Sequence, residues 1–415
     1  MIARLRSMLS GAPLILVATA VAGGSGYLAT AVVAAAKSPD QYLVFGAFWS
    51  ALYLVIAALS GIQQEVTRAS SASASANVSA GPGPRAIAGR FALIAAAVVA
   101  VAVVGTSPLW TRAVAESSVI GFAVPIAFGA AGYVFVAVVC GLLYGHRLWL
   151  AIAGMIGLDG LLRLAGIGLA LLAGGSFEML AWAVVLPFPL TLAILWWTFR
   201  SRLVGSSTLD VGLGRLAWNS SRTVVASIAT GLLVSGFPLL LTMTSGSAEP
   251  GRLGSLLFAI NIVRAPLVVV VMSLQSYFIV RFSARPRDAI RLFVTGSAVV
   301  LAVALLLAVG AWFFAPWAFS LLWPAYEITP LVAAGLVLAS GLLGVLCLSG
   351  PLALAESRHA IYTLGWVLAA VVTVIVLVLP LELIPRSLLA MLIAPLAAIV
   401  VHVVGVVGGR RRGSR

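Results

Sequence analysis

Charged residues and cysteine are scarce in this sequence. Only 9% of the 415 residues are charged and 62% are hydrophobic, and the mean hydropathy of +1.16 lies far beyond that of a soluble globular domain. The two cysteines, Cys140 and Cys347, lie inside apolar runs, which excludes a disulfide framework and a paired-cysteine metal site. His146, His359 and His402 lie at or near the ends of apolar runs and do not cluster. We therefore expect a polytopic membrane protein without a metal or another cofactor.

Apolar runs long enough to cross a bilayer, which takes about 20 residues, recur along the whole chain. Each should be a helix, because an open strand would leave backbone groups unpaired in lipid. The first run begins like a signal peptide, but it is long and many similar runs follow, so we interpret it as an uncleaved span. The predicted spans, about twelve in this all-α fold, cover residues 12–36, 41–62, 86–106, 119–144, 147–173, 178–199, 223–243, 253–279, 289–314, 331–355, 359–380 and 385–407.

The basic residues are distributed unevenly between the segments that join these spans. With the N-terminus inside, 19 of the 25 lie in segments predicted to be cytoplasmic or at the adjoining ends of spans, and two more, Arg163 and Arg264, lie deep within spans. The outer segments hold only four, namely Lys37, Arg112, Arg252 and Arg386. This bias places both termini on the cytoplasmic side of the cell membrane. The net charge of +14 is therefore a topology signal, and no nucleic-acid partner is expected.

The two halves of the chain resemble each other. A shift of 213 residues places "VTRAS" at 66–70 on "IVRFS" at 279–283, and it places His146 on His359. Six predicted spans in each half favour a parallel repeat. The expected organisation is a six-helix lobe at 1–199, a basic cytoplasmic linker at 200–222 and a second six-helix lobe at 223–415.

Polar residues in the first half of the chain gather in two spans. The second span ends with Gln64, Glu65 and Arg68, with Gln64 and Arg68 on one helical face and Glu65 one turn from Arg68. A solvated helix end with an ion pair would explain these three residues, because such pairs are common. The fifth span carries Asp159 and Arg163 one turn apart, where either charge alone would be costly. A self-neutralised structural pair is one interpretation, and a switch coupled to a proton is the other.

The eighth span carries a further basic residue, Arg264, in a segment without an acid. Pro266 should loosen the helix beside it and free a carbonyl. Asn261 and Gln275 lie on a similar face. An arginine at this depth must meet a wet cavity, an acid on another helix or an anionic substrate, so we predict that Arg264, Asn261 and Gln275 bind substrate.

Three short motifs together resemble actinobacterial polysaccharide-biosynthesis membrane proteins. They are "QQE..R" at 63–68, "DGLLR" at 159–163 and "RAPL" at 264–267 with a later glutamine. Those proteins belong to the multidrug/oligosaccharidyl-lipid/polysaccharide (MOP) exporter superfamily, near the O-antigen-type flippases. The resemblance implies two six-helix lobes around a central cavity that alternates between the membrane faces. By position it makes Arg163 and Arg264 cavity cations and sets Gln64, Glu65 and Arg68 near the inner mouth.

The expected function is that of a flippase rather than an enzyme. Its substrate would be a lipid-linked anionic glycan, its surroundings membrane lipids, and its partners cell-envelope glycosyltransferases. Arginine suits phosphate because its planar fork offers several donors. A cation-coupled multidrug exporter of the same architecture is the first rival, although it should line its cavity with acids. A membrane-embedded glycosyltransferase or polymerase is the second, although the longest outer segment predicted, 315–330, is short and aromatic. The low-complexity stretch at 69–84 is given no chemistry.

Overall fold

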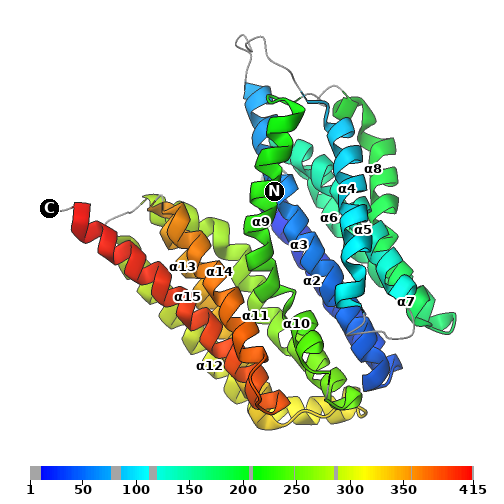
Figure 1. The fold of residues 1–415 in the computed structure, drawn as a ribbon, viewed down its shortest axis with the longest axis vertical. Helices are drawn as coiled ribbons and strands as arrows, with labels where there is room; N and C mark the ends of the chain where they lie inside the picture. The colour runs from blue at the N-terminus through cyan, green and yellow to red at the C-terminus, as the bar shows by residue number, and fades with distance from the viewer. Residues whose placement is uncertain are drawn as a thin grey trace, which may run out of the picture. The chain divides into compact units, whose positions relative to one another are not determined.

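The computed structural model describes residues 11–75, 86–111, 119–204, 209–246, 248–284, 288–356 and 358–413 (Figure 1). For residues 265–277 it describes the course of the backbone but not the side chains. The regular elements are α-helices, as the hydropathy pattern predicted.

The helices follow the predicted spans closely. They are α2 (Ala12–Ala36), α3 (Pro39–Ser75), α4 (Ala88–Trp110), α5 (Val119–Gly145), α6 (Trp149–Leu172), α7 (Phe177–Val185), α8 (Pro187–Val204), α9 (Leu213–Val234), α10 (Phe237–Thr244), α11 (Pro250–Ala284), α12 (Ala289–Leu322), α13 (Pro330–Ala355), α14 (His359–Leu377) and α15 (Leu383–Gly413). Each of the twelve predicted spans coincides with a helix or with two consecutive helices. In the described residues ten helices are long and apolar enough to cross a bilayer, or eleven if α9 and α10 count as one bent span.

The helix order of the first half returns in the second half. Helices α3 and α11 begin at residues 39 and 250, α5 and α13 at 119 and 330, and α6 and α14 at 149 and 359. The offset is 211, 211 and 210 residues in the three cases, close to the shift of 213 at which the sequence matches itself. A nearly constant offset between equivalent helices is what a parallel repeat produces.

The chain divides into two compact units. The first comprises the chain up to Val33 together with Ala47–Gly231, and the second comprises Ala34–Gly46 together with the chain from Leu232 onward. In the first unit α5 packs against α4, α6, α7 and α8. In the second, α13 packs against α11, α12, α14 and α15, and most of its residues are buried.

Two predicted spans are not continuous helices. The sixth span is interrupted at Leu186, between α7 and α8, where Pro187 and Pro189 remove two backbone donors. The seventh is interrupted at Ser235 and Gly236, between α9 and α10, and the two helices are bent by 71°. Hydropathy averages over a window, so it does not register a break of one or two residues inside an apolar run.

Three predicted loops are partly helical. The linker expected at 200–222 contains the end of α8 and the beginning of α9, and the division into units falls within α9. The outer segment expected at 315–330 is helical as far as Leu322. The low-complexity stretch begins inside α3, which ends at Ser75, and residues 76–84 lie outside the described residues. In α3 and α9 the helix extends into polar residues, which do not by themselves end a helix, and in α12 it continues through the apolar residues 315–322.

Close approaches between backbones hold each unit together. In the first unit a Cβ added at Gly61 of α3 would lie 2.5 Å from the backbone of Thr223 in α9, and the Thr223 hydroxyl donates to the Gly61 carbonyl at 2.8 Å. In the second unit Gly254 of α11 leaves room for the carbonyl of Pro39. Glycine permits both contacts because it has no Cβ.

Candidate functional site

The first candidate site surrounds Arg163, whose side chain is only 6% exposed. Its Nη1 lies 2.8 Å from Oδ2 of Asp159, and its Nη2 donates to Oδ1 at 2.9 Å. Nε donates to the carbonyl of Val184 at 3.0 Å, and Nη1 donates to the hydroxyl of Tyr53 at 3.0 Å. The guanidinium carbon lies 5.0 Å from the ring centre of Phe188. The ion pair predicted from the spacing is formed, and Arg163 also joins α6 to α3 and α7.

The second candidate site surrounds Arg264 in α11, which is 8% exposed. Its Nη2 donates to the carbonyl of Leu233 at 3.4 Å, and its guanidinium carbon lies 5.9 Å from the ring centre of Phe237. These partners lie on either side of the break between α9 and α10. The Leu233 carbonyl belongs to the neighbouring span. That Pro266 frees a carbonyl in its own helix stays a prediction, because the side chain of Pro266 lies outside the described residues.

The two arginine sites share one arrangement. Each guanidinium donates to a carbonyl in the last turn of a helix that ends at an interruption, Val184 in α7 and Leu233 in α9. Each also lies over the phenylalanine four residues further on, Phe188 or Phe237. The last carbonyls of a helix lack an intrahelical donor and carry the negative end of the macrodipole, so a buried cation is stabilised there.

The other residues predicted to bind substrate lie in the second unit. Nδ2 of Asn261 donates to the hydroxyl of Tyr42 at 3.4 Å. Tyr42 belongs to an aromatic cluster in which its ring centre lies 5.2 Å from that of Phe258 and 5.9 Å from that of Tyr326. The side chain of Gln275 lies outside the described residues. Asn261 is therefore engaged with the aromatic cluster, and its role in binding substrate stays a prediction.

The aromatic cluster contains one titratable group outside the spans, the phenol of Tyr326. Its hydroxyl donates to the carbonyl of Lys37 at 3.0 Å. Burial raises the pKa of Tyr326 above its ordinary value, and the nearby Tyr42 adds to the effect. Tyr326 therefore keeps its proton, and with it this hydrogen bond, at neutral pH.

The residues predicted at the inner mouth form a network in the first unit. Arg68 donates to Glu65 through Nε at 2.9 Å and through Nη2 at 2.8 Å. Asn219 of α9 also donates to Glu65, at 2.9 Å, and Nη1 of Arg68 lies 3.6 Å from Asp210. Gln64 is exposed. The sequence indicated the pair within α3 but not Asn219 or Asp210, because partners about 150 residues away leave no local spacing.

One polar cluster was not predicted at all. His402 was expected near a helix end, but it lies within α15 and is fully buried. Its Nδ1 is 2.8 Å from the hydroxyl of Ser349, and its Nε2 is 3.0 Å from the carbonyl of Tyr362. A Cβ at Gly365 would collide with the imidazole ring, so the glycine makes room for it. The sequence signal for this cluster was an isolated histidine in an apolar run. The contact with Gly365 could not be predicted, because the glycine lies in the preceding helix, α14.

Within the described parts of the chain, no group of three or more His, Cys, Asp or Glu side chains could hold a metal ion. Cys140 and Cys347 are both buried and reduced.

Solved structures with the same fold are transporters. An inward-facing multidrug resistance MATE family transporter of the MOP superfamily matches 98% of this chain and 96% of its own length, with a TM-score of 0.65 and 15% identity. A MOP superfamily transporter from Pyrococcus furiosus, described as having a binding pocket of reverse polarity, matches 98% of this chain and 97% of its own length, with a TM-score of 0.61 and 16% identity. The chain thus has the two-lobed, all-helical fold of MATE-type transporters in the MOP superfamily.

Relatives by sequence are found in mycobacteria. No family model matches the chain. The uncharacterized protein Mb3654 of Mycobacterium bovis is 30% identical over 393 residues, which cover 93% of this chain and 90% of that protein. The uncharacterized protein Rv1510 of Mycobacterium tuberculosis is 29% identical over 390 residues, which cover 93% and 89%. This chain belongs to the family of these mycobacterial proteins.

Proposed function

We propose that this chain is an alternating-access transporter that moves a polyprenyl-linked anionic oligosaccharide, or a related glycolipid precursor, from the inner to the outer leaflet of the cell membrane. The fold is that of MATE-type transporters, and fold alone does not determine what is carried. The choice of substrate rests on the sign of the charges buried within the spans.

The buried charges favour an anion over a cation. Arg163 and Arg264 both lie within apolar helices and are almost fully buried. Away from the first turns of the candidate spans of the described chain, the acids are Glu65 and Asp159, and each lies 2.8 Å from an arginine nitrogen. Helix α11, which carries Arg264, contains no acidic residue. Arginine recognises phosphate through charge-assisted hydrogen bonds, so this interior suits a pyrophosphate-linked lipid.

A cation-coupled multidrug exporter is the alternative, because one of the solved relatives by fold is described as a multidrug transporter. Such an exporter needs acids that can bind its cation, and the acids described above already have arginine partners. The Pyrococcus furiosus transporter supports this argument, because its reverse pocket polarity is described as suggesting a different function within the same superfamily. The polarity of the interior is therefore the property to test.

The test uses the purified protein in liposomes that contain a fluorescent glycan linked to a short polyprenyl diphosphate. Translocation is measured as the fraction of glycan that becomes protected from a quencher added outside. Arg264→Gln removes the charge and the bond from Nη2 to the Leu233 carbonyl, but it keeps a polar side chain with N–H donors. We expect it to lower translocation roughly 10- to 100-fold, the equivalent of one charge-assisted hydrogen bond.

The matched control lies on the same helix. Arg252 is near the beginning of α11 and is exposed, so Arg252→Gln removes the same charge without reaching the interior. Arg264→Lys keeps the charge but not the fork, and it should retain part of the activity. Normal translocation by Arg264→Gln would contradict the assignment. Efflux of a cationic drug without movement of the glycan would favour the exporter.

A further inference from the structure

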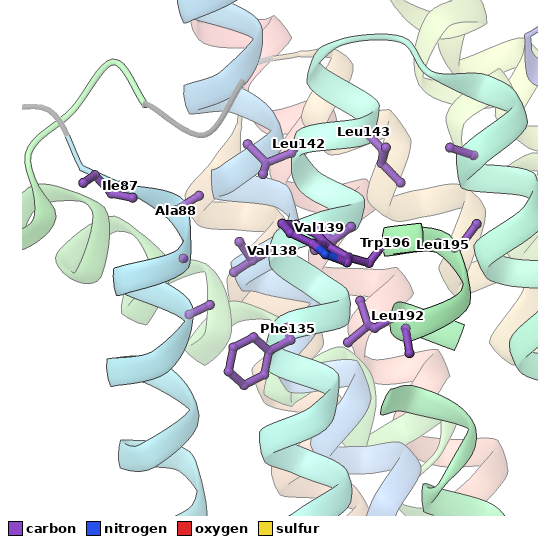
Figure 2. A pocket seen from close by; sticks show the side chains of 14 residues that line it. Ile87, Ala88, Phe135, Val138, Val139, Leu142, Leu143, Leu192, Leu195 and Trp196 are labelled. Carbon is purple, nitrogen blue, oxygen red and sulfur yellow. The ribbon is translucent and has the colours of Figure 1, made fainter. Parts of the chain in front are cut away.

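The first unit contains an apolar groove between α4, α5 and α8, with a volume of about 460 Å³ (Figure 2). Its walls include Gly89 on α4, Phe135 and Leu142 on α5, and Leu192 and Trp196 on α8. Figure 2 shows Phe135 and Leu142 directed from α5 toward α4, and Leu192 and Trp196 facing α5 from the other side. Gly89 is exposed, and a Cβ added there would meet nothing within 4 Å.

The groove lies at one end of its helices. It includes the first turns of α4 and the last turns of α5, and the lining on α5 runs from Phe135 to Leu143. Eight steps of 1.5 Å give a length of about 12 Å, close to one leaflet of a hydrocarbon core roughly 30 Å thick. This end of the helices is the one that the basic residues predict to be cytoplasmic, so the groove faces the inner leaflet.

Basic residues accompany this end of the groove. Arg90 follows Gly89 in the first turn of α4 and is exposed. Arg147 is exposed in the turn between α5 and α6, between Leu143 and Ala151, which both line the groove. Of the four helices that contribute to the lining, α4, α5 and α8 contain no acidic residue, and the one acid of α6, Asp159, is paired with Arg163. An apolar groove with arginines beside its end complements a lipid that carries an anionic headgroup.

We infer that this groove holds the tail of a polyprenyl phosphate lipid, with the phosphate beside Arg90 and Arg147. Each isoprene unit carries a planar double bond and a methyl branch, for which the flat faces of Phe135 and Trp196 offer a broad contact. The inference rests on the proposed function, and it assigns the site that keeps the substrate lipid beside the protein before translocation.

The experiment is photolabelling in liposomes with a polyprenyl phosphate that carries a diazirine near the phosphate end of its tail. A diacyl phosphatidic acid with a diazirine in one acyl chain serves as the second probe. Gly89→Leu places a side chain in the groove, and Gly105→Leu is the matched control, because it lies on the same helix, is exposed and also meets nothing within 4 Å.

We expect the polyprenyl probe to label α5 and α8 in the wild type. Gly89→Leu should lower this labelling about tenfold, which corresponds to the displacement of about two buried CH₂ groups, and Gly105→Leu should not. Equal labelling of the two variants, or stronger labelling of the groove by phosphatidic acid, would overturn the inference. Translocation of the glycan by the wild type is measured in parallel. If the wild type moves no glycan, the proposed function fails. If it moves glycan while the variants label alike, only the groove assignment fails.

Discussion

The pair of Asp159 and Arg163 permits a quantitative test, because the two residues differ in what they contribute. Arg163 makes two contacts with Asp159 and one each with Val184 and Tyr53. Asp159 is 22% exposed and is bonded to Arg163. Arg163→Gln therefore leaves a largely buried carboxylate without its partner. In Asp159→Asn the guanidinium keeps its hydrogen bonds to Val184 and Tyr53 and its contact with the ring of Phe188.

The magnitudes follow from this asymmetry. Removing one partner of a buried pair costs about 3–5 kcal/mol, and Arg163→Gln should fall at the lower end because the carboxylate is partly exposed. Leaving the Val184 carbonyl without its donor adds about 1–3 kcal/mol unless the glutamine replaces it. Asp159→Asn should cost less, because three of the arginine's stabilising contacts remain. In the double variant the two effects should fail to add by about 0.5–3 kcal/mol.

Two quantities are measured for the wild type, both single variants and the double variant. Thermal stability in detergent gives the coupling between the two residues, and translocation in liposomes gives the function. We expect the double variant to be more stable than Arg163→Gln. We also expect it to remain unable to transport, because we propose that Arg163 exchanges Asp159 for the anionic headgroup during the cycle and that the released acid takes up a proton.

Two results would refute this reasoning. Strictly additive losses of stability would mean that the ion pair does not couple the two residues. Full transport by the double variant would mean that the charges serve only to neutralise each other. The interpretation of the pair as a switch would then be wrong, and the interpretation as a structural ion pair would stand.

The remaining predictions concern topology and packing. Reporter fusions after residues 40, 115, 248 and 325 should report the outer side, because 19 basic residues lie on the predicted inner side and four on the outer side. A cytoplasmic signal from any of the four fusions would contradict the span assignment. Gly61→Ala should lower stability by roughly 1–3 kcal/mol, because the added Cβ meets the backbone of Thr223, whereas Gly105→Ala should be neutral; equal melting temperatures of the two variants would contradict the packing of α3 on α9.

The positions of the spans could be predicted from the sequence because lipid imposes a simple rule. A segment must be apolar for about 20 residues and must satisfy its own backbone, so hydropathy alone located a helix at every predicted span. The pair of Asp159 and Arg163 was predictable for a similar reason, because residues four apart on a helix are neighbours.

Contacts between distant segments could not be predicted in this way. The donation from Arg163 to Val184 depends on how α6 packs against α7, and the bond from Asn219 to Glu65 depends on α9 lying beside α3. The helix breaks had a partial signal, since "LPFPL" at 186–190 and "SGFPL" at 235–239 share a phenylalanine and a proline in the same places. The similarity could be interpreted only once the structure showed an arginine side chain in contact with each break.

The bonds of Arg163 bear on the proposed mechanism. A guanidinium has five N–H donors, and the contacts to Asp159, Val184 and Tyr53 use four of them. A phosphate takes two donors from an arginine fork, so Arg163 cannot bind one in this arrangement without giving up a bond that it now makes. The bonds to Asp159 are the ones to exchange, because a phosphate replaces the carboxylate with a charge of the same sign, whereas the Val184 carbonyl would lose its donor. Binding of a phosphate through two donors of Arg163 therefore requires the ion pair to open, and this opening distinguishes a switch from a purely structural pair.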